Sequence, residues 1–204
     1  MQAFDIVEEF ERRVAEYAGA KYGVAVHSCT DALMLSFWLR KLQHGITKVV
    51  LPKRTYVGVP YAALNAGLVC RFVDMDWSGA YRIEPGIVDA ARRFHAGMYE
   101  EGTLYCLSFH WYKNLPIGRG GMILTNDETD AFMLKQMRYD GRTAGVAPDE
   151  DTFVLPGYHC YMAGDDAWQG IRLMENVKGY NEDIPWDNYP DLSKYPIFQR
   201  GYTW

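Results

Sequence analysis

The feature that most constrains the fold is an alternation of short apolar runs with helical stripes of apolar residues. Apolar side chains at steps of three and four from Phe4 to Tyr17 predict an amphipathic helix. The strand-like run Tyr22 to Val26 follows, and after a polar turn at Ser28 comes an apolar helix from Ala32 to Leu42. Strands that alternate with helices in this way predict a parallel sheet with helices on both faces.

The same alternation continues along the chain. Further strands are expected at 49–51, 68–73, 87–88, 104–109 and 122–124, and further helices at 57–66, 128–138 and 162–177. With 204 residues, 49% of them apolar, the chain has room for one ordinary α/β core. After Gly179 the residues are mostly Pro, Asp, Asn and Tyr without a period. We therefore expect one domain at residues 1–178 and an irregular tail at 179–204.

Charge and cysteine usage exclude several classes of function. The net charge is −5 and Lys and Arg form no run, so neither nucleic acid nor an anionic membrane is an expected partner. No apolar stretch approaches the ~18–20 residues of a membrane span, which predicts a soluble, cytoplasmic protein. The four cysteines share no metal-ligand spacing, so no metal site is expected: Cys29, Cys70, Cys106 and Cys160.

Polar residues follow several of the expected strands. In an open α/β sheet, ligands bind where the loops at the strand ends meet. Ser28, Cys29 and Thr30 open a helix, where unpaired backbone N–H groups and a positive dipole suit a phosphate. The alternative is that they only cap the helix, because Ser, Thr and Asp are the common caps. Other residues expected at the same crevice are Thr55, Tyr56, Asp89 and Ser108 to Lys113.

Lys113 lies in a loop, five residues after Ser108, in the segment S-F-H-W-Y-K-N. From that loop a lysine can point back into the crevice. An amine held near an apolar wall is partly neutral and can attack a carbonyl, as a Schiff-base lysine must. The alternative is an ordinary solvated loop lysine, since Lys is rarely buried.

Two segments resemble motifs of the DegT/StrS-type sugar aminotransferases. Residues 26–33 resemble the family's V-x-S-G-T-x-A-L, with Cys29 in place of Gly. Residues 108–127 are similar to its lysine motif, S-F-H-x-x-K-N-L-x-x-G-x-G-G-M-x-x-T-N-D. The resemblance implies an α/β fold, the large domain of the fold-type I pyridoxal 5'-phosphate (PLP) transferases. That domain is an αβα sandwich with a mostly parallel sheet.

The resemblance also implies roles for individual residues. Lys113 corresponds to the Schiff-base lysine, and Tyr56 to the residue that stacks on the pyridine ring. The phosphate of PLP would be held at the helix start and the strand end, by Ser28, Cys29, Thr30 and Ser108.

Asp89 resembles the aspartate of the family's D-A-A segment, which pairs with the pyridine nitrogen. A carboxylate there keeps the ring protonated, and the protonated ring is the electron sink of PLP chemistry. Asp89 could instead cap the next helix. Arg92 stands where the family usually has Gln or His near the phenolic oxygen of the cofactor, so it is a further candidate contact.

The resemblance is shortened in two places. A strand–helix unit of the family is missing between Asp76 and Asp89, and the small C-terminal domain is missing as well. His159, in Y-H-C-Y-M, stands where the family has the Asn that reaches the phosphate of the partner subunit. It could equally be a packed residue of a Tyr-rich interface.

The resemblance implies transfer of an amino group from an amino acid to a keto sugar linked to a nucleotide. Glutamate is the expected amino donor. A lysine at position 113 favours this reaction, because the family's sugar dehydratases have His there. Two alternatives stay open. The chain could be a degenerate PLP-binding scaffold or partner subunit without turnover, or it could catalyse another PLP reaction on a small amino acid.

Aromatic residues make up 15% of the chain, and many of its 15 Tyr and 6 Trp follow Tyr139. Aromatic residues are enriched in subunit interfaces. We therefore expect a homodimer with its two sites at or near the interface. The alternative is an aromatic tail folded back over its own sheet.

Overall fold

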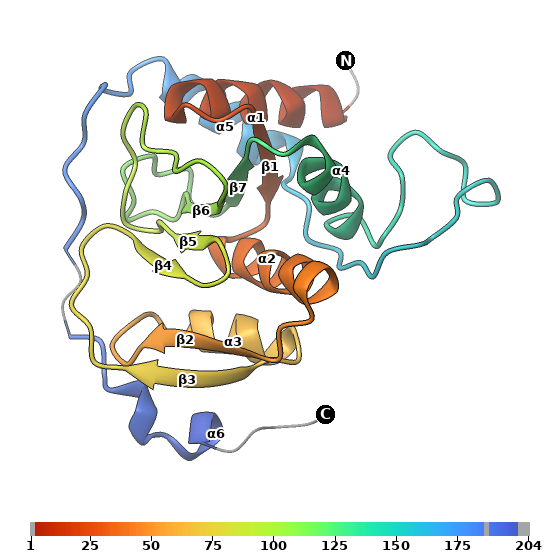
Figure 1. The fold of residues 1–204 in the computed structure, drawn as a ribbon. Coiled ribbons are helices and arrows are strands. Elements are labelled where there is room, and N and C mark those ends of the chain that lie inside the picture. Colours follow the sequence, from red (N-terminus) through yellow and green to blue (C-terminus); the bar gives the residue numbers. More distant parts are fainter. Residues whose placement is uncertain (1–2, 186–187, 200–204) are drawn as a thin grey trace.

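The computed structural model describes residues 3–185 and 188–199 (Figure 1). No helix in these two ranges combines the length and apolar character needed to cross a membrane. The helices are α1 (Ala3–Ala18), α2 (Cys29–His44), α3 (Gly58–Asn65), α4 (Glu128–Met137), α5 (Gly164–Met174), the 3-10 helix η1 (Leu192–Lys194) and α6 (Pro196–Gln199). The strands are β1 (Tyr22–Val26), β2 (Lys48–Pro52), β3 (Val69–Val73), β4 (Tyr81–Ile83), β5 (Ile87–Asp89), β6 (Leu104–Ser108) and β7 (Gly121–Thr125).

Five strands form the main sheet, in the order β1-β7-β6-β5-β4. β5 and β6 pair in parallel, while β7 is antiparallel to both of its neighbours and β4 is antiparallel to β5. It follows that β1, β5 and β6 run in one direction and that β7 and β4 run against them. The C-terminal ends of β1, β5 and β6 therefore meet at one edge of the sheet.

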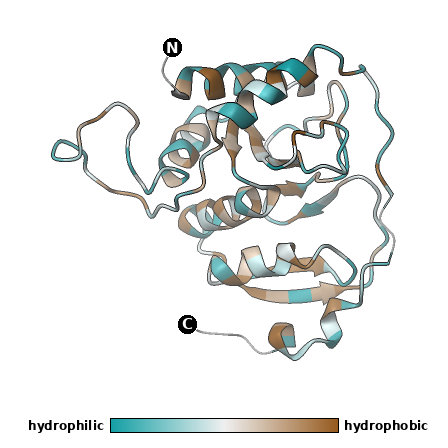
Figure 2. Ribbon diagram, turned by 180° about the vertical axis from the view of Figure 1, so that it is seen from behind, coloured by the Kyte–Doolittle hydropathy of each residue, from teal (hydrophilic) through white to brown (hydrophobic). Residues whose placement is uncertain are grey.

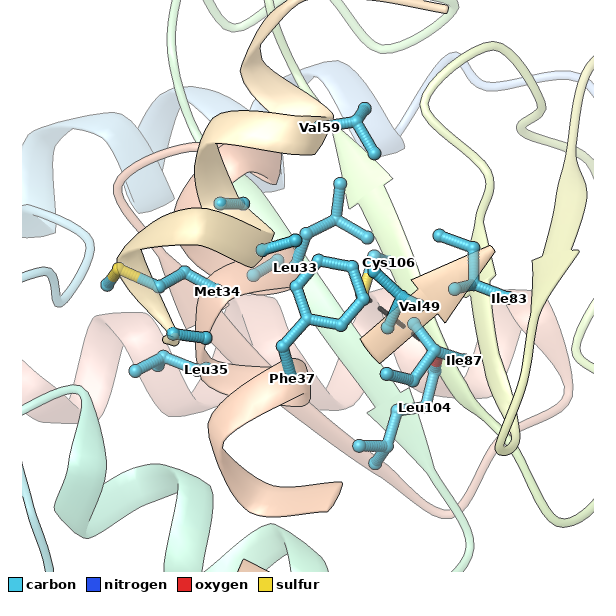
Figure 3. Close-up of a cluster of buried hydrophobic side chains, with 14 of the residues drawn as sticks. Leu33, Met34, Leu35, Phe37, Val49, Val59, Ile83, Ile87, Leu104 and Cys106 are labelled. Carbon is cyan, nitrogen blue, oxygen red and sulfur yellow. Dashed lines mark hydrogen bonds between the residues drawn. The ribbon is translucent and has the colours of Figure 1, made fainter. Parts of the chain in front are cut away.

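β2 and β3 form a separate, parallel pair, where the sequence predicted a single sheet. The hydrophobic core nevertheless joins the two sheets. Val49 of β2 packs in one buried cluster with Leu33 and Phe37 of α2 and with Leu104 and Cys106 of β6 (Figure 3). Figure 2 shows hydrophobic residues along much of the β2–β3 pair and in part of the neighbouring α6.

Helices cover both faces of the main sheet, which gives the expected αβα layers. Strand residues alternate between the two layers, as the pleat requires. On β1, Val24 and Val26 pack in the cluster of α2, whereas Ala25 packs in the cluster of α1 and α5. On β7, Ile123 belongs to the first cluster and Met122 to the second.

β4 was not predicted from the sequence. Tyr81 to Ile83 form the edge strand of a hairpin with β5, and Tyr81 lies directly across from Asp89. Both Tyr81 and Ile83 are buried. The hairpin occupies the region between Asp76 and Asp89 where the family's strand–helix unit was expected to be missing.

The segment after α5 runs along one side of the molecule toward α6 (Figure 1). Its described residues 178–185 and 188–191 are irregular, but η1 and α6 follow. Part of it folds back onto the body of the chain, because Leu192 N donates to Lys53 O (2.8 Å) and Phe198 packs edge-on against Tyr61. The division into a domain at 1–178 and a tail at 179–204 stays a prediction.

Candidate active site

A cavity of about 340 Å³ opens at the sheet edge where β1, β5 and β6 end. Its size lies within the ~300–1,000 Å³ typical of small-molecule sites. Every predicted site residue except His159 lines it: Ser28, Cys29, Thr30, Tyr56, Asp89, Arg92, Ser108 and Lys113. Residues far apart in the sequence thus converge as the strand-end rule predicts.

The first turn of α2 forms one wall of this cavity. Ser28 is the N-cap, with its Oγ accepting a hydrogen bond from Asp31 N (3.1 Å). Capping does not exclude binding here, because the Ser28 side chain pairs with only one N–H group, that of Asp31, and a helix start has four without a partner inside the helix. Gly121, the first residue of β7, lies against this turn, and a Cβ at Gly121 would lie 2.5 Å from Cys29 N.

Lys113 reaches the cavity from the loop between β6 and β7. The loop returns to β7 through Gly118 and Gly120, whose φ angles of 119° and 127° favour glycine. Within the described part of the chain, the Lys113 amine has no ion-pair partner. Burial, and secondly the charge of Arg92, lower the pKa of Lys113. A larger share of its amine is therefore neutral and nucleophilic than in a solvated lysine.

Asp89 is buried at the end of β5. Its Oδ2 accepts a hydrogen bond from the hydroxyl of Tyr81 (2.8 Å), and its Oδ1 accepts one from Ala91 N (3.0 Å). Burial raises the pKa of Asp89, and the donors Ala91 and Tyr81 oppose that shift. A turn follows Asp89 instead of a helix, so the alternative that it caps a helix is wrong.

Arg92 lines the cavity but is also held by the tail. Its Nη2 donates to the Tyr189 hydroxyl (2.9 Å), and its Nη1 donates to the Pro185 carbonyl oxygen. Tyr189 in turn lies nearly parallel to Trp77, with ring centroids 6.4 Å apart. The tail thereby supplies part of an aromatic wall of the cavity.

His159 lies outside the cavity of its own chain. Its Nδ1 is 2.6 Å from Asp140 Oδ2, and its ring packs edge-on against Tyr161. The side chain is 66% exposed, in the long segment between α4 and α5. Its predicted contact with the phosphate of a partner subunit stays a prediction.

Among the residues that line this cavity, sequence reasoning missed Trp77, Arg119 and Tyr189. It also missed Tyr81, which donates a hydrogen bond to Asp89. A signal for Tyr81 existed, because it alternates with Ile83 before the turn dipeptide Pro85-Gly86, a hairpin pattern. Arg119 is the variable residue between two motif glycines, and it pairs with Asp166 (3.0 Å). Nothing local in the sequence indicates that Trp77 or Tyr189 would reach the site.

A larger hollow, of about 660 Å³, lies at the opposite end of the sheet, beside the start of α4. Its buried charges pair with one another. Arg40 donates to Asp130 (3.0 Å), and Gln43 donates to the other oxygen of the same carboxylate (2.6 Å). Because these groups satisfy each other, the smaller cavity is the better candidate for chemistry.

The α/β layers are those of the fold-type I PLP-dependent transferases. Solved structures agree on the fold. AtS13 from Actinomadura melliaura matches with a TM-score of 0.76 at 20% identity, over 84% of this chain and 60% of that one. The Bacillus subtilis protein ntda, solved with bound PMP, matches with a TM-score of 0.69 at 22% identity, over 84% and 48%.

The chain belongs to the DegT/DnrJ/EryC1/StrS aminotransferase family, whose model matches residues 2–93 and 87–182. GDP-perosamine synthase of Caulobacter vibrioides is a curated relative, 24% identical over 84% of this chain and 57% of its own length. The chain spans about half the length, or less, of the curated relatives it matches. The two matched segments of the family model meet at 87–93, within and just after the β4–β5 hairpin.

Proposed function

We propose that the chain binds PLP in the cavity and transfers an amino group from an amino acid to a keto sugar. The single observation that carries this proposal is the meeting of an unpaired, partly buried Lys113 amine with the buried Asp89 carboxylate in one cavity. Family membership supports the same reaction class.

The residues fit the cofactor at each of its polar groups. The first turn of α2 offers unpaired N–H groups, and Thr30 and Ser108 add hydroxyls to the same cavity for a phosphate. Asp89 uses two of the roughly four acceptor sites of its carboxylate on Tyr81 and Ala91, which leaves acceptor capacity for a ring N–H. Tyr56, at the cavity wall, is the stacking partner that we propose for the ring.

Bound PLP supplies an electron sink for the bonds around the amino carbon. The chain supplies the rest. Lys113 is the amine that would hold the cofactor and, once released, would carry a proton to and from the reacting carbon as base and acid. Its lowered pKa suits both roles, because a catalytic base works best near the ambient pH. Asp89 fixes the ring in place.

We infer glutamate as the donor and a nucleotide-linked keto sugar as the acceptor. The relative from Caulobacter is named GDP-perosamine synthase, after a sugar linked to a nucleotide. This name supports a nucleotide-linked sugar as the acceptor class. Arg92 and Arg119 line the cavity and offer cationic groups for a carboxylate or a phosphate of these substrates.

The test is replacement of the lysine. Lys113→Ala should abolish both the visible absorbance band of the protein mixed with PLP and the adduct trapped by borohydride. Lys21→Ala, which removes an exposed lysine remote from the cavity, is the matched control and should keep both signals. Trapped label on a lysine other than Lys113 would show that the site is wrong.

A second measurement separates catalysis from binding alone. Adding L-glutamate to the PLP-loaded protein should shift the band as the amino group is transferred to the cofactor. A band that stays unchanged with every amino donor would identify a binding scaffold without turnover. Formation of a racemised or cleaved amino acid would instead identify a different PLP reaction.

A further inference from the structure

The hydroxyl of Tyr81 is the only side-chain donor to Asp89 in the described part of the chain. Thr55 Oγ1 lies 2.8 Å from the same hydroxyl oxygen. A phenol has one proton, so if Tyr81 donates to Asp89, the Thr55 hydroxyl must donate to Tyr81. The three side chains therefore form a directed chain of hydrogen bonds that ends on the carboxylate.

This chain of hydrogen bonds is shielded from water. Thr55 is 1% exposed, and Tyr81 and Asp89 are each 5% exposed. Trp77 packs against the Tyr81 ring, with centroids 4.8 Å apart, and fixes the phenol in place. In so dry a setting, a hydrogen bond to a charged group is stronger than in water, and its loss is correspondingly costly.

The position of Tyr81 follows from the register of the hairpin. Tyr81 pairs directly with Asp89 across β4 and β5, and side chains of directly paired residues lie on the same face of a sheet. This hairpin lies where the two matched segments of the family model meet. Tyr81 lies within the first matched segment, shortly before the second one begins at residue 87.

We propose that Tyr81 is a positioning residue, which keeps the Asp89 carboxylate ionised and oriented toward the ring nitrogen of the cofactor. This inference rests on the proposed function, because it needs PLP in the cavity. Without the phenolic donor, the buried carboxylate would retain only the backbone donor Ala91 N and would favour its neutral form. A neutral carboxyl group cannot form a charge-assisted bond with a protonated ring nitrogen.

The variant Tyr81→Phe removes the hydroxyl and keeps the ring that packs on Trp77. Dissociation constants are measured for PLP and for the analogue in which a CH group replaces the ring nitrogen. We expect the variant to bind PLP about tenfold more weakly, the effect of losing a hydrogen bond to a charged group, and to bind the analogue as the unmodified protein does. Tyr99→Phe, which removes a half-buried hydroxyl remote from the cavity, should change neither constant.

If Tyr81→Phe weakens the binding of PLP and of the analogue equally, Tyr81 has only a structural role and the inference is wrong. If it weakens the binding of neither, the inference is also wrong. Thr55→Val provides a second test if Tyr81→Phe does not fold. It should lower the preference for PLP over the analogue in the same direction but by less, because Tyr81 keeps its own hydroxyl. Failure of the proposed function is distinguishable. A protein that does not bind PLP would show no absorbance band even without substitution, and one that binds PLP without turnover would show a band that L-glutamate does not shift.

Discussion

At the scale of single residues, the cavity holds two ionisable groups whose pKa values are both shifted from the ordinary ones. Burial raises the pKa of Asp89 and lowers that of Lys113, so in each case the neutral form gains. Opposite shifts in neighbouring groups are typical of sites where protons are exchanged. The hydrogen-bond donors Ala91 and Tyr81 oppose the shift at Asp89 and so favour the negative charge that we propose for contact with the ring nitrogen.

Replacing that charge is the sharpest test at this scale. Asp89→Asn keeps the size of the side chain and its contact with Tyr81 but cannot hold a protonated ring nitrogen. We expect PLP to remain bound and its reaction with L-glutamate to slow by about a hundredfold or more, as when one preorganised electrostatic group is lost. Stopped-flow absorbance measures this rate.

Asp76→Asn is the matched control, because it removes an equal charge from an exposed position near the same hairpin. It should leave the rate unchanged. An unaltered rate in Asp89→Asn would contradict the assignment of Asp89.

Residues at strand ends could be predicted because their position follows from local patterns. Ser28 follows one apolar strand and Lys113 lies in the loop that follows another, and such strand ends meet at one edge. Tyr81 could not be placed in the same way, since its role depends on a register across β4 and β5 that places it opposite Asp89. Tyr189 depends on the path of an irregular segment, for which the sequence has no period.

At the scale of elements, the approach of β7 to α2 sets the shape of the phosphate end of the cavity. A Cβ at Gly121 would lie 2.4 Å from the carbonyl carbon of Ser28. Those neighbours are backbone atoms of a capped helix start, so they cannot rotate away as a flexible side chain can. The strand and the helix therefore fit only if residue 121 has no side chain.

Gly121→Ala should lower the free energy of unfolding by about 1–3 kcal/mol, the usual cost of overpacking a core, and weaken PLP binding. Chemical denaturation and a PLP titration measure the two effects. Gly179→Ala is the control, because a Cβ there meets no atom within 4 Å. A variant at 121 as stable as this control would show that the close approach is not real.

Most elements could be predicted, but their directions could not. Helical stripes and apolar runs identified α1, α2 and β1 to within a few residues. The antiparallel direction of β7 was missed, although the loop between β6 and β7 has no helix and a parallel neighbour usually needs a helical crossover. β4 was missed because its alternation of Tyr81 and Ile83 spans only three residues, although the turn dipeptide Pro85-Gly86 that follows was a signal for a hairpin.

At the scale of the whole molecule, exposed hydrophobic side chains gather on the segment between α4 and α5. This segment extends away from the body (Figure 1) and carries Phe153, Val154 and Tyr158, which are 52%, 72% and 50% exposed. The tail, in contrast, covers some of its own aromatics, since Tyr189 and Phe198 pack on the chain itself. Folding back therefore applies to the tail, and self-association stays a prediction for the segment between α4 and α5.

We expect a homodimer in which this segment contacts the second copy and brings His159 toward the partner's cavity. Light scattering after size-exclusion chromatography should give about twice the chain mass of 23.4 kDa. Val154→Asp, which places a charge on the most exposed of the three side chains, should shift the protein toward the monomer. A 23.4 kDa species that binds PLP tightly would contradict the dimer.

The hydrogen bonds at Thr55, Tyr81 and Asp89 also have a mechanical consequence. Thr55 lies in the loop that leaves the β2–β3 pair, whereas Tyr81 and Asp89 belong to the main sheet. A single linkage thus spans the gap between the two sheets and ends on the carboxylate. Sliding of the smaller sheet against the larger one would stretch this linkage, so strain applied far from the cavity would reach the group that we propose to hold the ring.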